Sequence, residues 1–143
     1  MKIVIADDDP AVRSLLTETV QELGHDPVPV TGGEGALERV RLYDCSVLLL
    51  DWMMPGMDGL EICREIRRHD TEDENVCYII MSSSRESSED VSRALRAGAD
   101  DYISKNTHPA ELRARISVGV RTALLEKKLI DLNNRLKFLV RTD

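Results

Sequence analysis

The chain has 143 residues, of which 42% are hydrophobic and 31% charged, and this size and balance predict one globular domain with a single core. Its formal net charge of −7 argues against a surface built for nucleic acid or anionic lipid, so we expect protein partners and no direct contact with nucleic acid or a membrane. No apolar run approaches the roughly 20 residues of a membrane span, and the start, "MKIVIADDDP", turns acidic too soon for a signal peptide. These features predict a cytoplasmic protein.

The three cysteines, Cys45, Cys63 and Cys77, are odd in number and far apart in the sequence. They lack the CxxC spacing of a zinc site and the even number of a disulfide framework. We therefore expect buried thiols in a reducing compartment.

Short apolar runs alternate with longer segments of helical period, which is the pattern of a parallel sheet covered by helices. The predicted strands comprise residues 2–6, 26–30, 46–50, 76–82 and 101–105. The second, "DPVPV", contains two prolines that cannot donate to a sheet, so we place it at a sheet edge. The third, "SVLLL", is apolar on both faces, which is typical of a central parallel strand.

The predicted helices lie between these strands and after the last one. They run from Pro10 to Gly24, up to about Leu42, from Leu60 to a break in the acidic segment 69–75, up to Gly98, and from Pro109 to about Val140. Glycine supplies the ends of the first and fourth helices. No internal repeat or low-complexity tract interrupts this alternation.

Polar residues stand at the carboxyl ends of four predicted strands. Asp7 and Asp8 follow the first, Asp51 the third and Ser83 the fourth, and Lys105 ends the fifth. Ligands collect beyond the carboxyl ends of the strands in an open parallel sheet, so we expect these residues around one crevice. Three carboxylates there would repel one another, and Mg²⁺, which prefers oxygen ligands, would relieve the repulsion. A lysine and a hydroxyl beside such a metal complete a receptacle for a phosphoryl group.

Each of these features has a simpler interpretation when it is taken alone. An acidic run such as "DDD" is more often a solvated loop and helix cap, and "MPGMDG" could be a turn in which Gly56 and Gly59 supply permissive backbone angles. Lys105 could be a surface lysine and Ser83 a loop hydroxyl. Their coincidence at strand ends in one topology favours the common site.

Four segments in this order, "IADDDPAVR", "LLLDWMMPGMDG", "IIMSSS" and "GADDYISK", resemble the receiver domain of two-component response regulators, over roughly residues 2–121. The resemblance implies an α/β, flavodoxin-like, doubly wound fold: five parallel strands in the order 2-1-3-4-5, helices on both faces and an extended C-terminal helix. We accordingly divide the chain into a receiver domain, 1–121, and a helical extension, 122–143.

The resemblance also implies how the crevice works. Asp51 would accept a phosphoryl group from a phosphohistidine on a sensor histidine kinase or phosphotransfer protein, forming an aspartyl phosphate. Asp8, Asp51 and the backbone carbonyl of Met53 would bind Mg²⁺, and Asp7 would act through water. The hydrophobic strand thus ends on a carboxylate because Asp51 must meet a metal and a phosphate.

The remaining roles concern the response to phosphorylation. Lys105 would pair with the phosphate, Ser83 would bond a phosphate oxygen, and Tyr102 would follow from an outward to an inward rotamer, which makes the fourth helix, fifth strand and fifth helix the output face.

Asn106 stands where the family usually has a proline in a cis peptide. Because a cis bond before another residue costs about 2.5 to 4 kcal/mol, we expect a trans bond here. Ser84 stands where alanine or glycine is common and would narrow access to Asp51.

Two other functions remain open. A Mg²⁺-dependent phosphatase or hydrolase with an aspartate nucleophile uses the same groups, but it usually carries a second aspartate two residues later as general acid, and Met53 cannot shuttle a proton. A degenerate receiver used only for binding or dimerisation is disfavoured because every charged group is present. We expect a signalling switch whose only chemistry is its own phosphorylation and dephosphorylation, not a turnover enzyme.

The last predicted helix carries the a and d positions of a heptad pattern. These positions are Leu125, Leu129, Leu132, Leu136 and Leu139. They predict a coiled-coil homodimer, and in a parallel pair Arg121 at g would face Glu126 at e of the partner. The alternative is an amphipathic helix folded back on its own domain, since Ile130 and Phe138 lie off the pattern and widen the apolar face.

The tail also resembles the helical linker that joins many receivers to a cyclic-dinucleotide-synthesising (GGDEF) domain. The segment "LVRTD" would be the place where such an effector begins. We therefore expect a possible effector beyond this chain, with a lone receiver that dimerises through its helix as the alternative.

Overall fold

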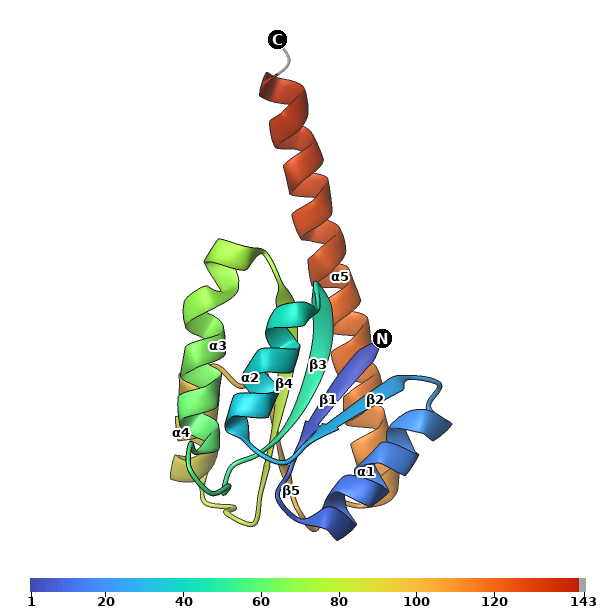
Figure 1. Ribbon diagram of the computed structural model, residues 1–143, viewed down its shortest axis with the longest axis vertical. Helices are drawn as coiled ribbons and strands as arrows, with labels where there is room; N and C mark the ends of the chain where they lie inside the picture. Colours follow the sequence, from blue (N-terminus) through green and yellow to red (C-terminus); the bar gives the residue numbers. More distant parts are fainter. Residues whose placement is uncertain (142–143) are drawn as a thin grey trace.

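The computed structural model describes residues 1–141, and the side chains of all of these except 70–73, 140 and 141. One sheet of parallel strands has the order β2-β1-β3-β4-β5, as expected (Figure 1). The strands are β1 (Lys2–Ala6), β2 (Asp26–Val30), β3 (Cys45–Asp51), β4 (Val76–Ser83) and β5 (Asp101–Ser104). The helices are α1 (Pro10–Glu22), α2 (Gly33–Leu42), α3 (Gly59–Asp73), α4 (Ser88–Ala97) and α5 (Pro109–Arg141).

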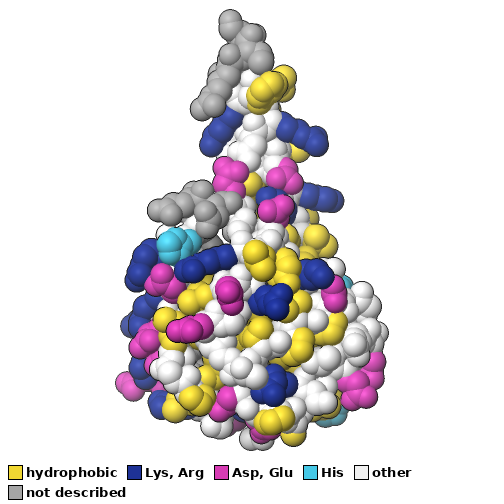
Figure 2. Space-filling model, viewed as in Figure 1, with side chains coloured by type: hydrophobic (Ala, Val, Ile, Leu, Met, Phe, Trp, Pro, Cys, Tyr) yellow, Lys and Arg dark blue, Asp and Glu magenta, His cyan; other side chains and the backbone are white. Residues whose placement is uncertain are grey.

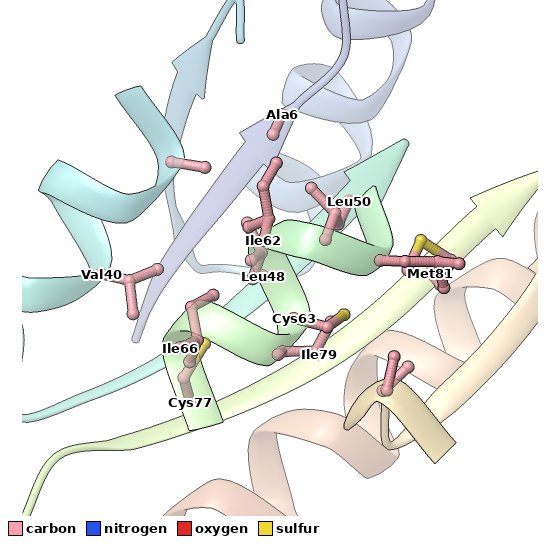
Figure 3. Packing of buried hydrophobic residues seen from close by; sticks show 14 of the residues in the cluster. Ala6, Val40, Leu48, Leu50, Ile62, Cys63, Ile66, Cys77, Ile79 and Met81 are labelled. Atoms are coloured by element: carbon pink, nitrogen blue, oxygen red, sulfur yellow. The ribbon is translucent and has the colours of Figure 1, made fainter. Parts of the chain in front are cut away.

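The core has two apolar layers, one on each face of the sheet, because successive side chains of a strand point to opposite faces. Val4 and Leu48 pack in the layer beneath α2, α3 and α4. In Figure 3, Ile62 of α3 lies over Leu48 in this layer. Ile3 and Leu49 pack in the other layer, with α1 and α5. The sheet is therefore covered on both faces, and its carboxyl edge is left for function.

The proline-containing strand β2 lies at the sheet edge, as predicted. Pro27 and Pro29 stand opposite Ile3 and Ile5 of β1, and the other side of β2 ends the sheet. An edge strand tolerates the two missing backbone donors.

Several predicted strand ends differ from the structure by one residue, including that of β5, which ends at Ser104 and not at Lys105. Helix α3 breaks within residues 69–75, as predicted, but late in this segment, because it continues to Asp73 and is followed by Glu74 in the left-handed region (φ 56°). This segment is polar but contains no proline or glycine until the helix has ended. Strands β3 and β4 are each longer than predicted at the carboxyl end, so Asp51 and Ser83 are the last residues of strands instead of the first residues of loops.

Helix α5 is 33 residues long, about 50 Å at about 1.5 Å per residue, and it projects well beyond the sheet (Figure 1). Its first half is anchored in the core by Ile116, Val120 and Ala123. Within residues 1–141, no helix combines the length and apolar character needed to cross a membrane. Residues 142 and 143 of the predicted extension lie outside the described residues.

Candidate functional site

Three carboxylates meet at the carboxyl edge of the sheet. Asp7 and Asp51 are buried, with 1% and 3% of their surface exposed, whereas Asp8 is exposed. One oxygen of each carboxylate lies within 4.8 Å of the other two. The third residue of the acidic run, Asp9, caps α1 instead, since its side chain accepts a hydrogen bond from the N–H of Ala11. The run thus contains two site carboxylates followed by a helix cap.

Asp51 is held in place by the sheet and by the turn that follows it. The next residue, Trp52, donates its N–H to the carbonyl of Ser82 (3.0 Å), and its own carbonyl accepts from the N–H of Gly59 (2.8 Å). A Cβ at Gly59 would lie 2.8 Å from the Cα of Trp52, so only glycine permits this close return of the chain. Within the turn, the N–H of Met53 donates to Asp51 Oδ1 (3.3 Å). The glycine-containing turn therefore fixes the Asp51 carboxylate at the strand end.

Lys105 joins the cluster from the end of β5. Its Nζ lies 3.2 Å from Asp51 Oδ2 and 3.4 Å from Asp7 Oδ2. The backbone N–H of Lys105 donates to the carbonyl of Ser83 (3.0 Å), which continues the pairing of β4 with β5. The bond to Asn106 is trans, as expected, and the Asn106 N–H donates to Ser104 Oγ (3.1 Å). The lysine is therefore held by the sheet without a cis peptide.

The electrostatics of the site favour an additional positive charge. Burial, followed by the nearby charge of Asp7, raises the pKa of Asp51 to about 6, although Lys105 pulls it down. Burial alone would lower the pKa of Lys105, but its contacts with Asp51 and Asp7 outweigh burial and raise it. One ammonium group therefore does not fully compensate the three carboxylates.

A chain of hydrogen bonds connects Ser83 to Tyr102 through a residue that the sequence did not reveal. The N–H of Arg85 donates to Ser83 Oγ (3.0 Å), and the carbonyl of Arg85 accepts a hydrogen bond from the Tyr102 hydroxyl. The Tyr102 ring packs edge-on against Trp52, with the ring centroids 6.2 Å apart and the planes at 89°. The Tyr102 hydroxyl is therefore directed toward the β4–α4 connection.

Trp52 is a second residue whose role the sequence did not reveal. It is 2% exposed, and the guanidinium carbons of Arg85 and Arg93 lie 5.2 and 5.5 Å from its ring centroid. Asp90 lies within 3.6 Å of both guanidinium groups. These contacts connect Trp52, the residue after Asp51, to the start of α4. The residues involved are far apart in the sequence, so only the structure reveals the contacts.

The predicted residues thus occupy one edge of the sheet in two groups. The first group consists of the three carboxylates of Asp7, Asp8 and Asp51, with Lys105 in contact with Asp7 and Asp51. In the second group, Ser83 and Tyr102 are linked through hydrogen bonds to Arg85. The side chain of Met53 is 56% exposed, so only its backbone faces the site through the contact with Asp51.

Comparisons with known proteins agree with this geometry. The family model described as the response regulator receiver domain matches residues 3–117. The DNA-binding response regulator MtrA of Mycolicibacterium smegmatis is 37% identical over 120 residues, which cover 84% of this chain and 50% of MtrA. This chain therefore spans about half the length of the curated relatives it matches first.

Two solved structures extend the comparison to three dimensions. The BeF3-activated N-terminal receiver domain of RstA from Klebsiella pneumoniae is 34% identical with a TM-score of 0.74, and the match covers 85% of this chain and 99% of that one. The receiver domain of the sensor histidine kinase PA1611 from Pseudomonas aeruginosa, which has a magnesium ion in its active-site cleft, is 25% identical with a TM-score of 0.73, over 83% and 96% of the two chains. From its sequence, sheet order and family match, the chain belongs to the response regulator receiver domain family.

Proposed function

We propose that this chain is a phosphorylation-controlled switch that accepts a phosphoryl group on Asp51. The observation that carries the proposal is the contact of 3.2 Å between Lys105 Nζ and the buried Asp51 carboxylate, beside two further carboxylates. A nucleophilic carboxylate next to a fixed cation is suited to a phosphoryl group, whose oxygens need positive charge during transfer.

The donor set fits Mg²⁺. Three carboxylate groups supply hard oxygen atoms within 4.8 Å of one another, and the described residues of this cluster include no sulfur or nitrogen ligand. We propose Asp8, Asp51 and the carbonyl of Met53 as ligands, with Asp7 acting through water. The ion would supply positive charge that offsets the phosphoryl oxygens. A receiver of similar structure binds magnesium in its cleft, which supports this assignment.

The transfer itself needs few groups from the protein. An Asp51 oxygen attacks the phosphorus of a phosphohistidine, the new P–O bond forms as the P–N bond breaks, and the imidazole keeps the electron pair and takes a proton from water. Lys105 pairs with a phosphoryl oxygen. The donor would be a sensor histidine kinase or a phosphotransfer protein.

A cleft between α1 and the start of α5 offers the donor a surface. It has a volume of about 170 Å³ and is lined largely by apolar side chains, including Leu15, Leu16 and Leu112, and by Lys105. Leu15 is 60% exposed. Because Lys105 borders this cleft and contacts Asp51, a domain seated there would bring its phosphohistidine to the acceptor.

The conformational response to phosphorylation would connect Ser83 with Tyr102 through hydrogen bonds. A hydroxyl can donate to a phosphoryl oxygen while it accepts from the Arg85 N–H, and Arg85 accepts from Tyr102. Phosphorylation would therefore favour the inward Tyr102 and change the face formed by α4, β5 and α5.

We further propose how the chain is organised. Residues 1–121 form the receiver and 122–143 a helical extension, the location is cytoplasmic, and two copies pair through the extension. An effector follows in a longer protein. Its class is either a cyclic-dinucleotide-synthesising domain, as the tail resembles, or a DNA-binding domain, as the name of MtrA suggests for that relative.

The test is the intact mass of the chain after incubation with acetyl phosphate or phosphoramidate and Mg²⁺. We expect a gain of one phosphate that disappears in Asp51→Asn and persists in the control Asp131→Asn, which changes an exposed carboxylate on α5. Absence of the gain in the parent chain would contradict the proposal. Repeated hydrolysis of p-nitrophenyl phosphate would instead favour the hydrolase.

A further inference from the structure

Helix α5 has one side that packs on its own domain. Ile116 and Ala123 are buried, and Ile130 packs against the same apolar layer. Further along, Asn134 Nδ2 donates to Glu74 Oε2 at the end of α3 (2.8 Å). At about 100° per residue, these positions of α5 share one side of the helix.

The opposite side carries the leucine seam, which we define as Leu125, Leu129, Leu132, Leu136 and Leu139. Each of these side chains is more than half exposed, between 55% and 68%. The seam lies about 180° around the helix from the side that packs on the domain. Figure 2 shows hydrophobic and charged side chains together on the projecting helix. Ile130 packs on its own domain, whereas the seam leucines form an exposed apolar stripe that a second helix could cover.

The charges beside the seam select the direction of a partner helix. If Leu125 occupies d, the g positions are Arg121, Lys128 and Arg135, all basic. In an antiparallel pair, these three basic residues would face the same three residues of the other helix, and the like charges would repel one another. A parallel pair instead places Arg121 opposite Glu126 of the partner, as g faces the following e. The charge pattern therefore favours the parallel arrangement.

We propose that the leucine seams of two copies of this chain pair in parallel, with each receiver domain on the outer side of the pair. Parallel pairing places the ends of the two seams that are distant from the sheets side by side. This inference rests on the proposed homodimer but not on phosphoryl transfer.

The first test is equilibrium sedimentation at about 10 to 200 μM, with and without beryllofluoride and Mg²⁺. Each copy of Leu129→Lys loses one leucine from the interface, so we expect the dissociation constant to rise at least about 100-fold. The matched control is Leu124→Lys, which changes a leucine that is 49% exposed but lies off the seam. The control should stay within about threefold of the parent chain. A parent chain that stays monomeric, or equal effects of the two variants, would overturn the proposal.

The second test measures orientation by disulfide formation, in a Cys45→Ser background because Cys45 is partly exposed. In a parallel dimer, Leu125→Cys and Leu136→Cys each cross-link to themselves. In an antiparallel dimer, only a mixture of the two variants cross-links. Asp131→Cys, at a position whose side chain is 58% exposed and off the seam, is the control and should not cross-link.

The intact mass of Leu129→Lys after phosphorylation separates the two proposals. A monomeric variant that still gains one phosphate shows that the two properties are independent. Failure of every chain to gain phosphate would contradict the proposed function alone, whereas failure to dimerise with normal phosphorylation would contradict this inference alone.

Discussion

Replacing Asp51 by asparagine should stabilise the protein when no divalent cation is present. Asp51 is 3% exposed and lies beside Asp7 and Asp8. Burial, followed by the charge of Asp7, raises its pKa to about 6, so at pH 7 the folded chain keeps an ionised carboxylate in a place that favours a neutral group. Asparagine has nearly the same shape and carries no charge.

The size of the effect follows from the pKa. A value of about 6 in the folded chain, against an ordinary 3.8, corresponds to about 3 kcal/mol at pH 7. Because the folded chain binds this proton more tightly than the unfolded chain, the free energy of unfolding falls as the pH rises from about 4 to about 6, and stays lower above this range. The Asn variant lacks this loss, so its unfolding midpoint at pH 7 should be roughly 10 °C higher.

The assay is urea denaturation in EDTA, followed by the fluorescence of Trp52, the single tryptophan of the chain. The Asn variant should exceed the parent by about 3 kcal/mol at pH 7 and by only about 1 kcal/mol at pH 4.5. Saturating Mg²⁺ should stabilise the parent more and reduce the difference. A parent as stable as the variant at pH 7 in EDTA, or a difference that is equal at both pH values, would refute this reasoning.

Three further variants test other parts of the site. Asp8→Ala should weaken Mg²⁺ binding at least about 10-fold, because an oxygen ligand is lost; unchanged titration curves of Trp52 fluorescence would exclude Asp8 as a ligand. Lys105→Ala should weaken the response of the same fluorescence to beryllofluoride, and a response equal to that of the parent would contradict the role of the ammonium group. Gly59→Ala should lower the free energy of unfolding in urea by about 2 to 3 kcal/mol, because its Cβ would meet backbone at 2.8 Å, whereas Gly32→Ala, whose Cβ would meet no atom within 4 Å, should have a much smaller effect.

The sequence predicted most of the fold because its local signals agreed with the packing. The two prolines of β2 predicted an edge strand, and the apolar run of β3 predicted a central one. The sequence predicted that α3 ends within the segment 69–75 but not where in this segment it ends, because a polar segment without apolar period does not mark the last helical turn. Its helical state depends on continuity with the packed turns before it.

The site was predictable as a set of residues but not as a set of contacts. The strand ends brought Asp7, Asp51 and Lys105 together, as the topology requires. The run "DDD" could not show that its first carboxylate is buried and its second exposed. The roles of Arg85 and Trp52 depend on bonds and ring contacts between segments far apart in the sequence, which no spacing reports.

Because α5 is one continuous helix, a change of its orientation at one end moves its other end. Its base packs against the sheet, where a Cβ at Gly119 would lie 2.8 Å from the Tyr78 ring of β4, and the chain contains no glycine or proline after this residue. The distance from Ala123 to Arg141 is about 27 Å along the axis. A tilt of about 5° at the base would displace the tip by about 2 Å, comparable to the helix shifts of known switches. A small change in how α5 packs on the sheet would therefore displace the C-terminal end of the helix. Such a displacement is large enough to change the alignment of a domain attached to that end.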